Sequence, residues 1–373
     1  MNQIIIGLDG MGGMLIKRLC RKENALSDGA VRYVHIKAES DTWNVSNQKV
    51  YTYPYSLSLK VKLGGGIEYG GKLLIADYPI IKDFITKQDS HDMARPWKIP
   101  LPKFFFQNRS RRIWRTAMVD GITHNPIGGF TTILRDCIFS LKHDPKYILG
   151  ENIFVRICVD LSDSLGTAMI VDLIAQLHKL IHSDNLIIDL YLFTRETDSD
   201  DDFVSFYQGS GYATLMELNA MYYHKYNPID IYGELDPMTG KVGRIYYEQA
   251  FRYGYIVSNR TDLGNIIEDD KVADNIEELL IRHQEHDFKF KETTSLIGRI
   301  FCDSYCVSKS RGLVACCFKE GKTSIYLYPS LDIITPYLSI GRSKYQYMIN
   351  ESNGVKEKIF LHTETLDELD DLF

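Results

Sequence analysis

The sequence lacks most signs of a secreted, membrane-bound or metal-rich protein. Its seven cysteines are scattered over 373 residues without a Cys-x-x-Cys pair, so neither a disulfide framework nor a zinc site is indicated. No apolar run reaches the roughly 18 residues of a membrane span, and no signal peptide precedes the first strand. The net charge of −6 argues against general nucleic-acid binding. We therefore expect a reduced, cytoplasmic protein with neither a nucleic-acid nor a membrane partner.

One grouping of cysteines leaves an alternative open. Cys302, Cys306, Cys316 and Cys317 lie close enough in sequence for a weak metal-site interpretation. Their small size and their apolar neighbours favour buried positions in strands instead.

The standard phosphate-binding motifs are missing too. The glycines at 7, 10, 12 and 13 do not match the Rossmann G-x-G-x-x-G spacing, and no Walker Lys-Ser pair follows them. What is present is an apolar run, Ile4 to Ile6, then this glycine-dense segment, then a helical pattern over residues 14–20. Glycines allow close backbone approach, and a helix N-terminus favours anions. The segment predicts a nucleotide-type ligand, or else a tight turn without one, and the carboxylate of Asp9 weakens the phosphate interpretation.

Further along the chain, strand and helix patterns alternate. Apolar runs at 31–36, 152–160, 186–193 and 251–257 predict strands, and helical spacing marks 130–140, 168–181, 211–223 and 272–283. This alternation predicts an α/β fold with a parallel sheet, whose ligands bind at the carboxyl ends of the strands.

The pattern changes after about residue 299 to short strands at 312–318 and 323–328, which suggests a second domain. We predict a nucleotide-binding domain over 1–260, an α+β domain over 261–350 and an acidic tail over 351–373. The last eight residues, 366–373, combine acidic residues with an apolar stripe. They are either disordered or a docking motif for another protein.

Several separated pieces together resemble the tubulin/FtsZ superfamily, and most of all the bacterial tubulin-like proteins. Gly7-Leu-Asp-Gly-Met-Gly-Gly13 is similar to the family's Gly-Leu-Gly-Gly-Thr-Gly-Gly turn, and Ser162-Asp-Ser-Leu-Gly-Thr-Ala168 aligns with its Gly-Gly-Gly-Thr-Gly-Ser-Gly loop. Residues 107–115 resemble the family's glutamine- and arginine-containing loop, and residues 211–218 its Ala-Tyr-Ala-x-Leu-x-Glu-Leu helix. The order of these pieces, from residue 1 to about 330, carries the resemblance.

The resemblance implies a tubulin/FtsZ-like, Rossmann-type GTPase domain followed by a smaller α+β domain, with GTP or GDP bound, alone or with Mg²⁺. It implies no metal ligand from the protein, and no catalytic acid carries over, because the family's acidic Asn-x-Asp-x-x-Asp loop has no counterpart here. The nucleotide-binding candidates are Gly7, Asp9, Gly10, Met11, Gly12, Gly13, Gln107, Arg109, Arg112, Ser162, Asp163, Ser164, Leu165, Gly166 and Thr167.

The departures from the family pattern have physical consequences. Ser162, Asp163 and Ser164 replace three glycines, which restricts the backbone and adds side chains beside the phosphates. A carboxylate about 4 Å from a phosphate costs about 4 kcal/mol at an effective dielectric constant near 20. Mg²⁺ would turn this repulsion into an attraction. The arginines at 109, 111, 112 and 115 would offset the repulsion if they face the site rather than solvent. For Asp163 we favour a helix N-cap over metal binding.

Three functions remain open. The first is a tubulin-like protein that binds guanine nucleotide and assembles head to tail into filaments or oligomers. The second is a degenerate, non-hydrolysing scaffold subunit of a multiprotein complex. The third is an NAD-dependent enzyme. It is the weakest, because Lys37 and Glu39 stand where an NAD-binding fold has its acidic residue at the end of the second strand. Whether the chain hydrolyses GTP is left undecided.

Overall fold

The computed structural model describes part of the chain. The longer ranges are 1–22, 29–38, 49–55, 130–181, 185–196, 202–231, 243–261 and 265–289, and the short pieces are 59–62, 66–69, 72–73, 111, 114, 233, 237–239, 313–318 and 325–328. The predicted site residues Gln107, Arg109 and Arg112 and the tail 351–373 lie outside these ranges.

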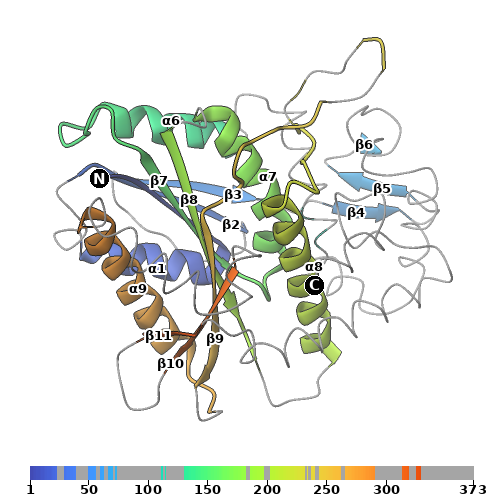
Figure 1. The fold of residues 1–373 in the computed structure, drawn as a ribbon. Helices are drawn as coiled ribbons and strands as arrows, with labels where there is room; N and C mark the ends of the chain where they lie inside the picture. The colour runs from blue at the N-terminus through green and yellow to red at the C-terminus, as the bar shows by residue number, and fades with distance from the viewer. Residues whose placement is uncertain are drawn as a thin grey trace.

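The described residues form one large sheet and one small one (Figure 1). The strands of the large sheet are β1 (Asn2–Leu8), β2 (Val31–Ala38), β3 (Val50–Tyr55), β7 (Ile153–Asp160), β8 (Leu186–Thr194), β9 (Tyr253–Thr261), β10 (Leu313–Phe318) and β11 (Ile325–Tyr328). The small sheet is antiparallel and consists of β4 (Leu59–Lys62), β5 (Gly66–Tyr69) and β6 (Lys72–Leu73).

The order of strands in the large sheet is β11-β10-β9-β8-β7-β1-β2-β3. All neighbouring pairs are parallel except β10 with β11. The chain moves outward from β1 through β2 to β3 and then crosses back to β7 on the other side of β1. The sheet therefore has a topological switch point between β1 and β7, which is where ligands bind in open α/β sheets.

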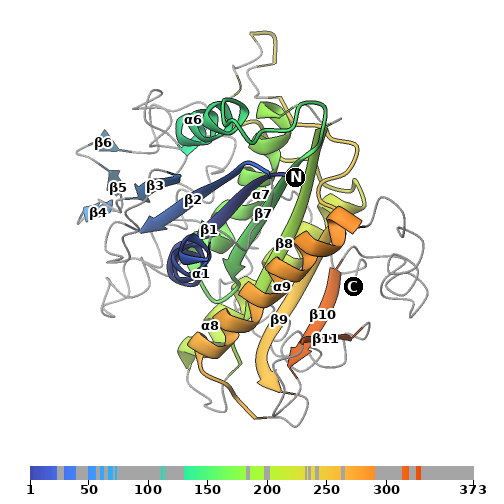
Figure 2. The same ribbon diagram turned by 90° about the vertical axis from the view of Figure 1, so that its left-hand side faces the viewer.

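Helices cover both faces of this sheet, as Figures 1 and 2 show. One face carries α1 (Asp9–Arg21) and α9 (Asp269–Lys289), and the other carries α6 (Phe130–Lys142), α7 (Ser164–Leu180) and α8 (Asp202–Tyr222). Alternate side chains of β1 enter the two cores: Ile4 and Ile6 pack toward α7, and Ile5 packs toward α1. Burial on both faces explains why the predicted strands read as nearly continuous apolar runs.

The predicted α/β class with a parallel sheet is confirmed. Each predicted strand of this sheet is present with shifts of a few residues at its ends. The predicted helix at 14–20 is wrong in its start, because α1 already begins at Asp9 and includes Gly10, Gly12 and Gly13. The helix predicted over 168–181 likewise begins at Ser164.

The strands β10 and β11 were expected in a second domain, but they extend the large sheet from β9. They do not form a separate sheet within the described part of the chain. The division near residue 260 stays a prediction, because most of the chain around these two strands lies outside the described ranges.

A backbone contact fixes α1 against the sheet. A Cβ added at Gly12 would lie 2.5 Å from the Cα of Gly7 and 3.3 Å from the carbonyl oxygen of Cys158. A Cβ added at Gly7 would lie 2.4 Å from the carbonyl oxygen of Gly12. Because backbone atoms cannot move aside as a flexible side chain does, both positions require glycine for packing.

We predict that Gly12→Ala lowers the free energy of unfolding by at least about 1–3 kcal/mol, the typical effect of overpacking. Gly10→Ala is the matched control in the same helical turn, because nothing lies within 4 Å of its added Cβ. That change should be neutral or stabilise by about 0.5–1 kcal/mol, since alanine favours helix. Urea denaturation measures both, and equal effects of the two substitutions would contradict the packing explanation.

Candidate functional site

The two predicted glycine segments meet at the switch point. Gly7 of β1 lies opposite Cys158 of β7, so the carboxyl ends of these strands are neighbours. Helix α1 begins directly after β1, and α7 begins shortly after β7 at Ser164. A Cβ added at Gly166 would lie 3.4 Å from the Cβ of Leu8, which places the first turn of α7 against the end of β1. Two helix N-termini thus open at one place, an arrangement that favours anions.

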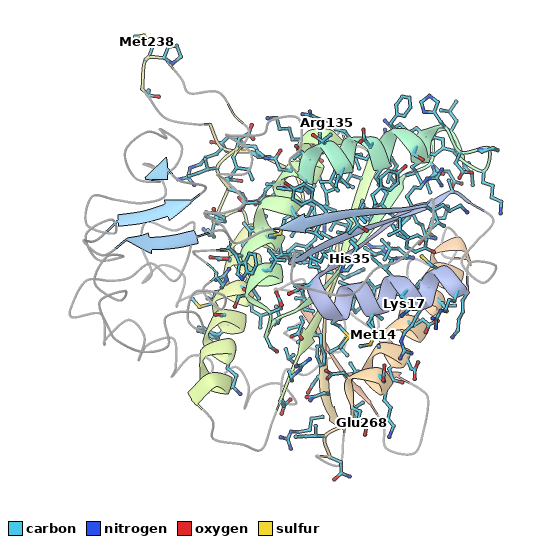
Figure 3. The ribbon with its side chains drawn as sticks, turned by 180° about the vertical axis from the view of Figure 1, so that it is seen from behind. Met14, Lys17, His35, Arg135, Met238 and Glu268 are labelled. Atoms are coloured by element: carbon cyan, nitrogen blue, oxygen red, sulfur yellow. The ribbon has the colours of Figure 1, made fainter. Side chains whose placement is uncertain are left out.

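Most of the predicted binding glycines serve packing. Gly13 leaves room for the His35 ring, since an added Cβ would lie 2.5 Å from it, and Gly166 leaves room for Val159 at the same distance. Figure 3 shows His35 between the sheet and α1. Gly10 differs from these, because its Cβ position is open and the residue is partly exposed. Of the described glycines in the two segments, Gly10 has the most room for a ligand, and nucleotide contact by the others stays a prediction.

Asp9 has an unusual backbone. Its φ of 53° lies in the left-handed region, which few residues other than glycine adopt. The Nε2 atom of His35 is 3.1 Å from the Asp9 carbonyl oxygen, and this contact holds the turn. Backbone strain of this kind occurs often at binding sites. Met11, another predicted site residue, is buried in the core beside Ile5.

Asp163 caps α7, which confirms the N-cap interpretation. Its Oδ1 accepts a hydrogen bond of 2.8 Å from the Gly166 amide. The Thr167 hydroxyl donates to the Asp163 carbonyl oxygen at 2.6 Å. These two predicted site residues, Gly166 and Thr167, therefore stabilise the helix start together with Asp163.

The Asp163 carboxyl also faces that of Asp9. Burial raises the pKa of Asp163 well above its ordinary value, and a hydrogen bond that the protonated Asp163 carboxyl donates to the neighbouring Asp9 carboxylate, together with the charge of Asp9, raises it further. Two carboxylates in such contact cannot both ionise easily. The pair needs either a shared proton or a cation.

A third carboxylate, Asp160, ends β7. Burial raises its pKa, although the charge of Arg195 opposes that effect. Arg195 lies 3.4 Å from Asp160 and 2.8 Å from Asp269, the first residue of α9, and its side chain is 46% exposed. The sequence analysis missed this arginine. Its position directly after the strand that neighbours β7 is the signal that could have found it.

The loop between β7 and α7 uses its own backbone donors. The Ser162 amide donates to Asp160 Oδ1 at 2.7 Å, and the Leu161 amide donates to the Phe193 carbonyl oxygen at 2.7 Å. The amides of Asp163 and Thr167 donate to backbone carbonyl oxygens at 3.0 and 3.1 Å. With the Gly166 amide on Asp163, these donors are engaged. A bare phosphate therefore fits this loop poorly, because it would meet carboxylates rather than free N–H groups.

A cation fits better. Mg²⁺ binds through one or two carboxylates and completes its coordination with water and phosphate oxygens. Asp9 and Asp163 offer such a pair. Among the described residues, no group of three or more His, Cys, Asp or Glu side chains is placed to hold a metal ion.

Arg111 is buried beneath the start of α7. It donates to the Thr167 carbonyl oxygen from Nη2 at 3.0 Å and pairs with Glu217 of α8 at 2.5 Å. The two side chains are 2% and 0% exposed. Arg111 is thus neither a solvated basic residue nor a phosphate contact; it joins two helices. Ser164 and Leu165 are buried in the same first turn.

The last residues of β9 contact the residues that follow β8. Ser258 and Arg260 donate to the Glu196 carboxylate at 2.5 and 2.7 Å. Asn259 exchanges two hydrogen bonds with the backbone of Glu196. These bonds join the ends of β8 and β9. On the other side, β2 ends in Lys37 and Ala38, which offer no acid to a ribose.

Comparison with solved structures gives weak likenesses to CetZ proteins. CetZ2 from Haloferax volcanii, a "GTPgS bound protofilament", has a TM-score of 0.38 and 13% identity over 76% of this chain and 59% of its own. CetZ from Methanosaeta thermophila has a TM-score of 0.38 and 10% identity over 84% of this chain and 61% of its own. The chain thus spans about 60% of the length of these two structures. No family model and no curated protein matches the sequence. None of the described helices is long and apolar enough to cross a membrane.

We predict that Asp163→Asn is neutral or stabilising at pH 7 with EDTA present. Asparagine keeps the cap acceptor and removes the like charge beside Asp9. Asp163→Ala should be less stable than Asp163→Asn by about 0.5–2 kcal/mol, because it loses the cap. Thermal and urea unfolding measure both variants.

The pH dependence has a definite sign. The pKa of Asp163 is raised in the folded state, so the folded protein binds this proton more tightly, and the wild type loses stability as pH rises above the ordinary carboxyl pKa. The advantage of Asp163→Asn should therefore grow from pH 4 to pH 7. An advantage that is constant or shrinks with pH would contradict the carboxyl contact.

We predict that Arg111→Met lowers the free energy of unfolding by about 3–5 kcal/mol, because it removes the ion-pair partner of the buried Glu217 carboxylate. Adding Glu217→Leu should restore much of this loss. The control is Arg18→Met, which breaks ion pairs with the exposed Asp270 and Asp274 and should change stability by about 0–1 kcal/mol. Similar losses at both arginines would show that burial of the Arg111 pair does not matter.

Proposed function

We propose that the switch point of this chain binds a guanine nucleotide together with Mg²⁺, and that the chain assembles head to tail as a tubulin-like protein. The observation that carries the proposal is the meeting of the α1 and α7 N-termini between β1 and β7 (Figure 2). The choice of guanine follows from the resemblance of the two loop sequences to the tubulin/FtsZ superfamily.

The proposal includes Mg²⁺ because the carboxylates of Asp9 and Asp163 lie where the phosphates would bind. Bound Mg²⁺ would neutralise the charge between the phosphates and the protein. Asp9 and Asp163 are the residues that would hold it, since their carboxyls are in contact. Gly10 gives the ligand space beside the first turn of α1, and the partly exposed Arg195 adds a positive charge at the rim.

A specific observation favours a second candidate, the non-hydrolysing scaffold. The amides of Leu161, Ser162, Asp163, Gly166 and Thr167 are already engaged within the protein. A site that satisfies its own donors has less to gain from a phosphate. According to this second candidate, the protein keeps its packing and its assembly surfaces but no longer binds a nucleotide.

The deciding measurement is a thermal shift with GTP and GDP, each with Mg²⁺ and with EDTA. The nucleotide proposal predicts a shift with Mg²⁺ alone, equivalent to about 2.7 kcal/mol of stabilisation at a ligand concentration of 100 Kd. Asp163→Asn should weaken the Mg²⁺-dependent shift, and Glu248→Gln, a change of an exposed carboxylate elsewhere, should not. Denaturing the purified protein and separating the supernatant by ion exchange tests for nucleotide carried through purification.

Other outcomes separate the candidates. If Asp163→Asn creates GTP binding that needs no Mg²⁺, the carboxylate repels phosphate and the cation bridge is wrong. No nucleotide and no shift in either buffer would favour the scaffold. Sedimentation with and without nucleotide then tests head-to-tail assembly, because contacts between unlike surfaces give open filaments.

A further inference from the structure

Helix α6 carries a basic and apolar face that no described element covers. Arg135, Phe139 and Lys142 lie at spacings of four and three residues and therefore share one side of the helix. His143 and Lys146 follow in the turn after α6, and all five residues are exposed. Figure 3 shows Arg135 on the outer side of α6, away from the sheet. We call these five residues the α6 face.

The basic residues of the α6 face have no ionic partners among the described residues. Other exposed cations do: Lys22 pairs with Glu277, and Lys179 pairs with Asp230. Two acids lie nearby. Asp144 is engaged by Arg32 at 2.6 Å, and Asp136 is exposed on α6 itself. The α6 face therefore keeps a net positive charge.

Two large apolar side chains are exposed on α6 and in the loop that follows it. Phe139 of the α6 face is 65% exposed, and its ring lies against that of His143, at 4.0 Å between ring centroids. Leu149, in the loop that follows, is 90% exposed. Exposed apolar groups beside unpaired cations are typical of an interaction surface for an acidic, amphipathic partner.

The chain itself contains a segment with the opposite charge and a matching apolar pattern. Residues 366–373, Leu-Asp-Glu-Leu-Asp-Asp-Leu-Phe, lie outside the described residues. Leu366, Leu369, Leu372 and Phe373 are at helical spacing and would share one side of a helix. The acidic residues are Asp367, Glu368, Asp370 and Asp371.

We propose that residues 366–373 dock on the α6 face, with their leucines and Phe373 against Phe139 and Leu149 and their carboxylates beside Arg135, Lys142 and Lys146. The proposal names one occupant, this chain's own acidic segment, on the basis of complementary charge and apolar spacing. It does not depend on the nucleotide proposal, because the α6 face lies away from the switch point.

The expected interaction is weak and sensitive to salt. Exposed ion pairs contribute little individually, so reversing one cation should weaken binding by about three- to tenfold. Screening at 0.5 M NaCl should remove most of the charge contribution, since the Debye length then falls to about 4 Å.

The test is fluorescence anisotropy of a labelled synthetic peptide of residues 361–373, titrated with the full chain. A full-length variant carrying Asp367→Asn, Glu368→Gln, Asp370→Asn and Asp371→Asn should bind this peptide more tightly than the wild type, because its own segment no longer competes. In that background, Lys142→Glu and Phe139→Ser should each weaken binding by about three- to tenfold. Lys225→Glu, a reversal of an exposed lysine elsewhere, is the matched control and should change nothing.

A charge swap makes the test specific. A peptide with Asp370→Lys and Asp371→Lys should regain affinity for the Lys142→Glu variant. Equal weakening by Lys225→Glu and Lys142→Glu would overturn the proposal, because it would mean non-specific attraction. Unchanged affinity of both the Lys142→Glu and the Phe139→Ser variant would also overturn it. The same holds if the peptide does not bind while the full chain binds anionic vesicles in a way that depends on Phe139. Far-UV circular dichroism of each variant confirms that it is folded.

Discussion

The order of the strands is the constraint on which the rest of this molecule depends. The chain turns outward on opposite sides of β1 and β7, so the connections that leave the carboxyl ends of these two strands run in opposite directions. The starts of α1 and α7 are brought together there, and everything placed at the two helix starts becomes part of one site. Asp9 follows β1, whereas Asp160 and Asp163 lie at the end of β7, and the pairing of these two strands brings the carboxyls together.

The chemistry at this junction combines two opposing demands. Two helix N-termini favour negative charge, and the protein supplies that charge itself through the Asp163 cap. The Asp9 carboxyl adds a second negative charge beside the cap, and this pair needs a shared proton or a metal cation.

The sequence predicted the sheet well because its strands are buried on both faces and give continuous apolar runs, as at 152–160. It predicted the Asp163 cap because Asp before a helical pattern is a local signal. It missed the early start of α1, because a run containing Gly10, Gly12 and Gly13 has low helix propensity and tertiary packing overrides it. The role of Arg111 could not be assigned from the sequence either, since its partner Glu217 is far away along the chain.

The contact between Gly7 and Gly12 has a consequence for how such proteins are compared. These two residues are held by sterics between a strand and a helix, whether or not anything binds above them. In a set of homologues they should therefore be invariant even in members that have lost their ligand. Gly10 has no such packing constraint, because the space around its Cβ position is open. Sequence variation at Gly10 would therefore report on whether a ligand occupies that space, whereas variation at Gly7 and Gly12 reports on the packing of the helix against the strand.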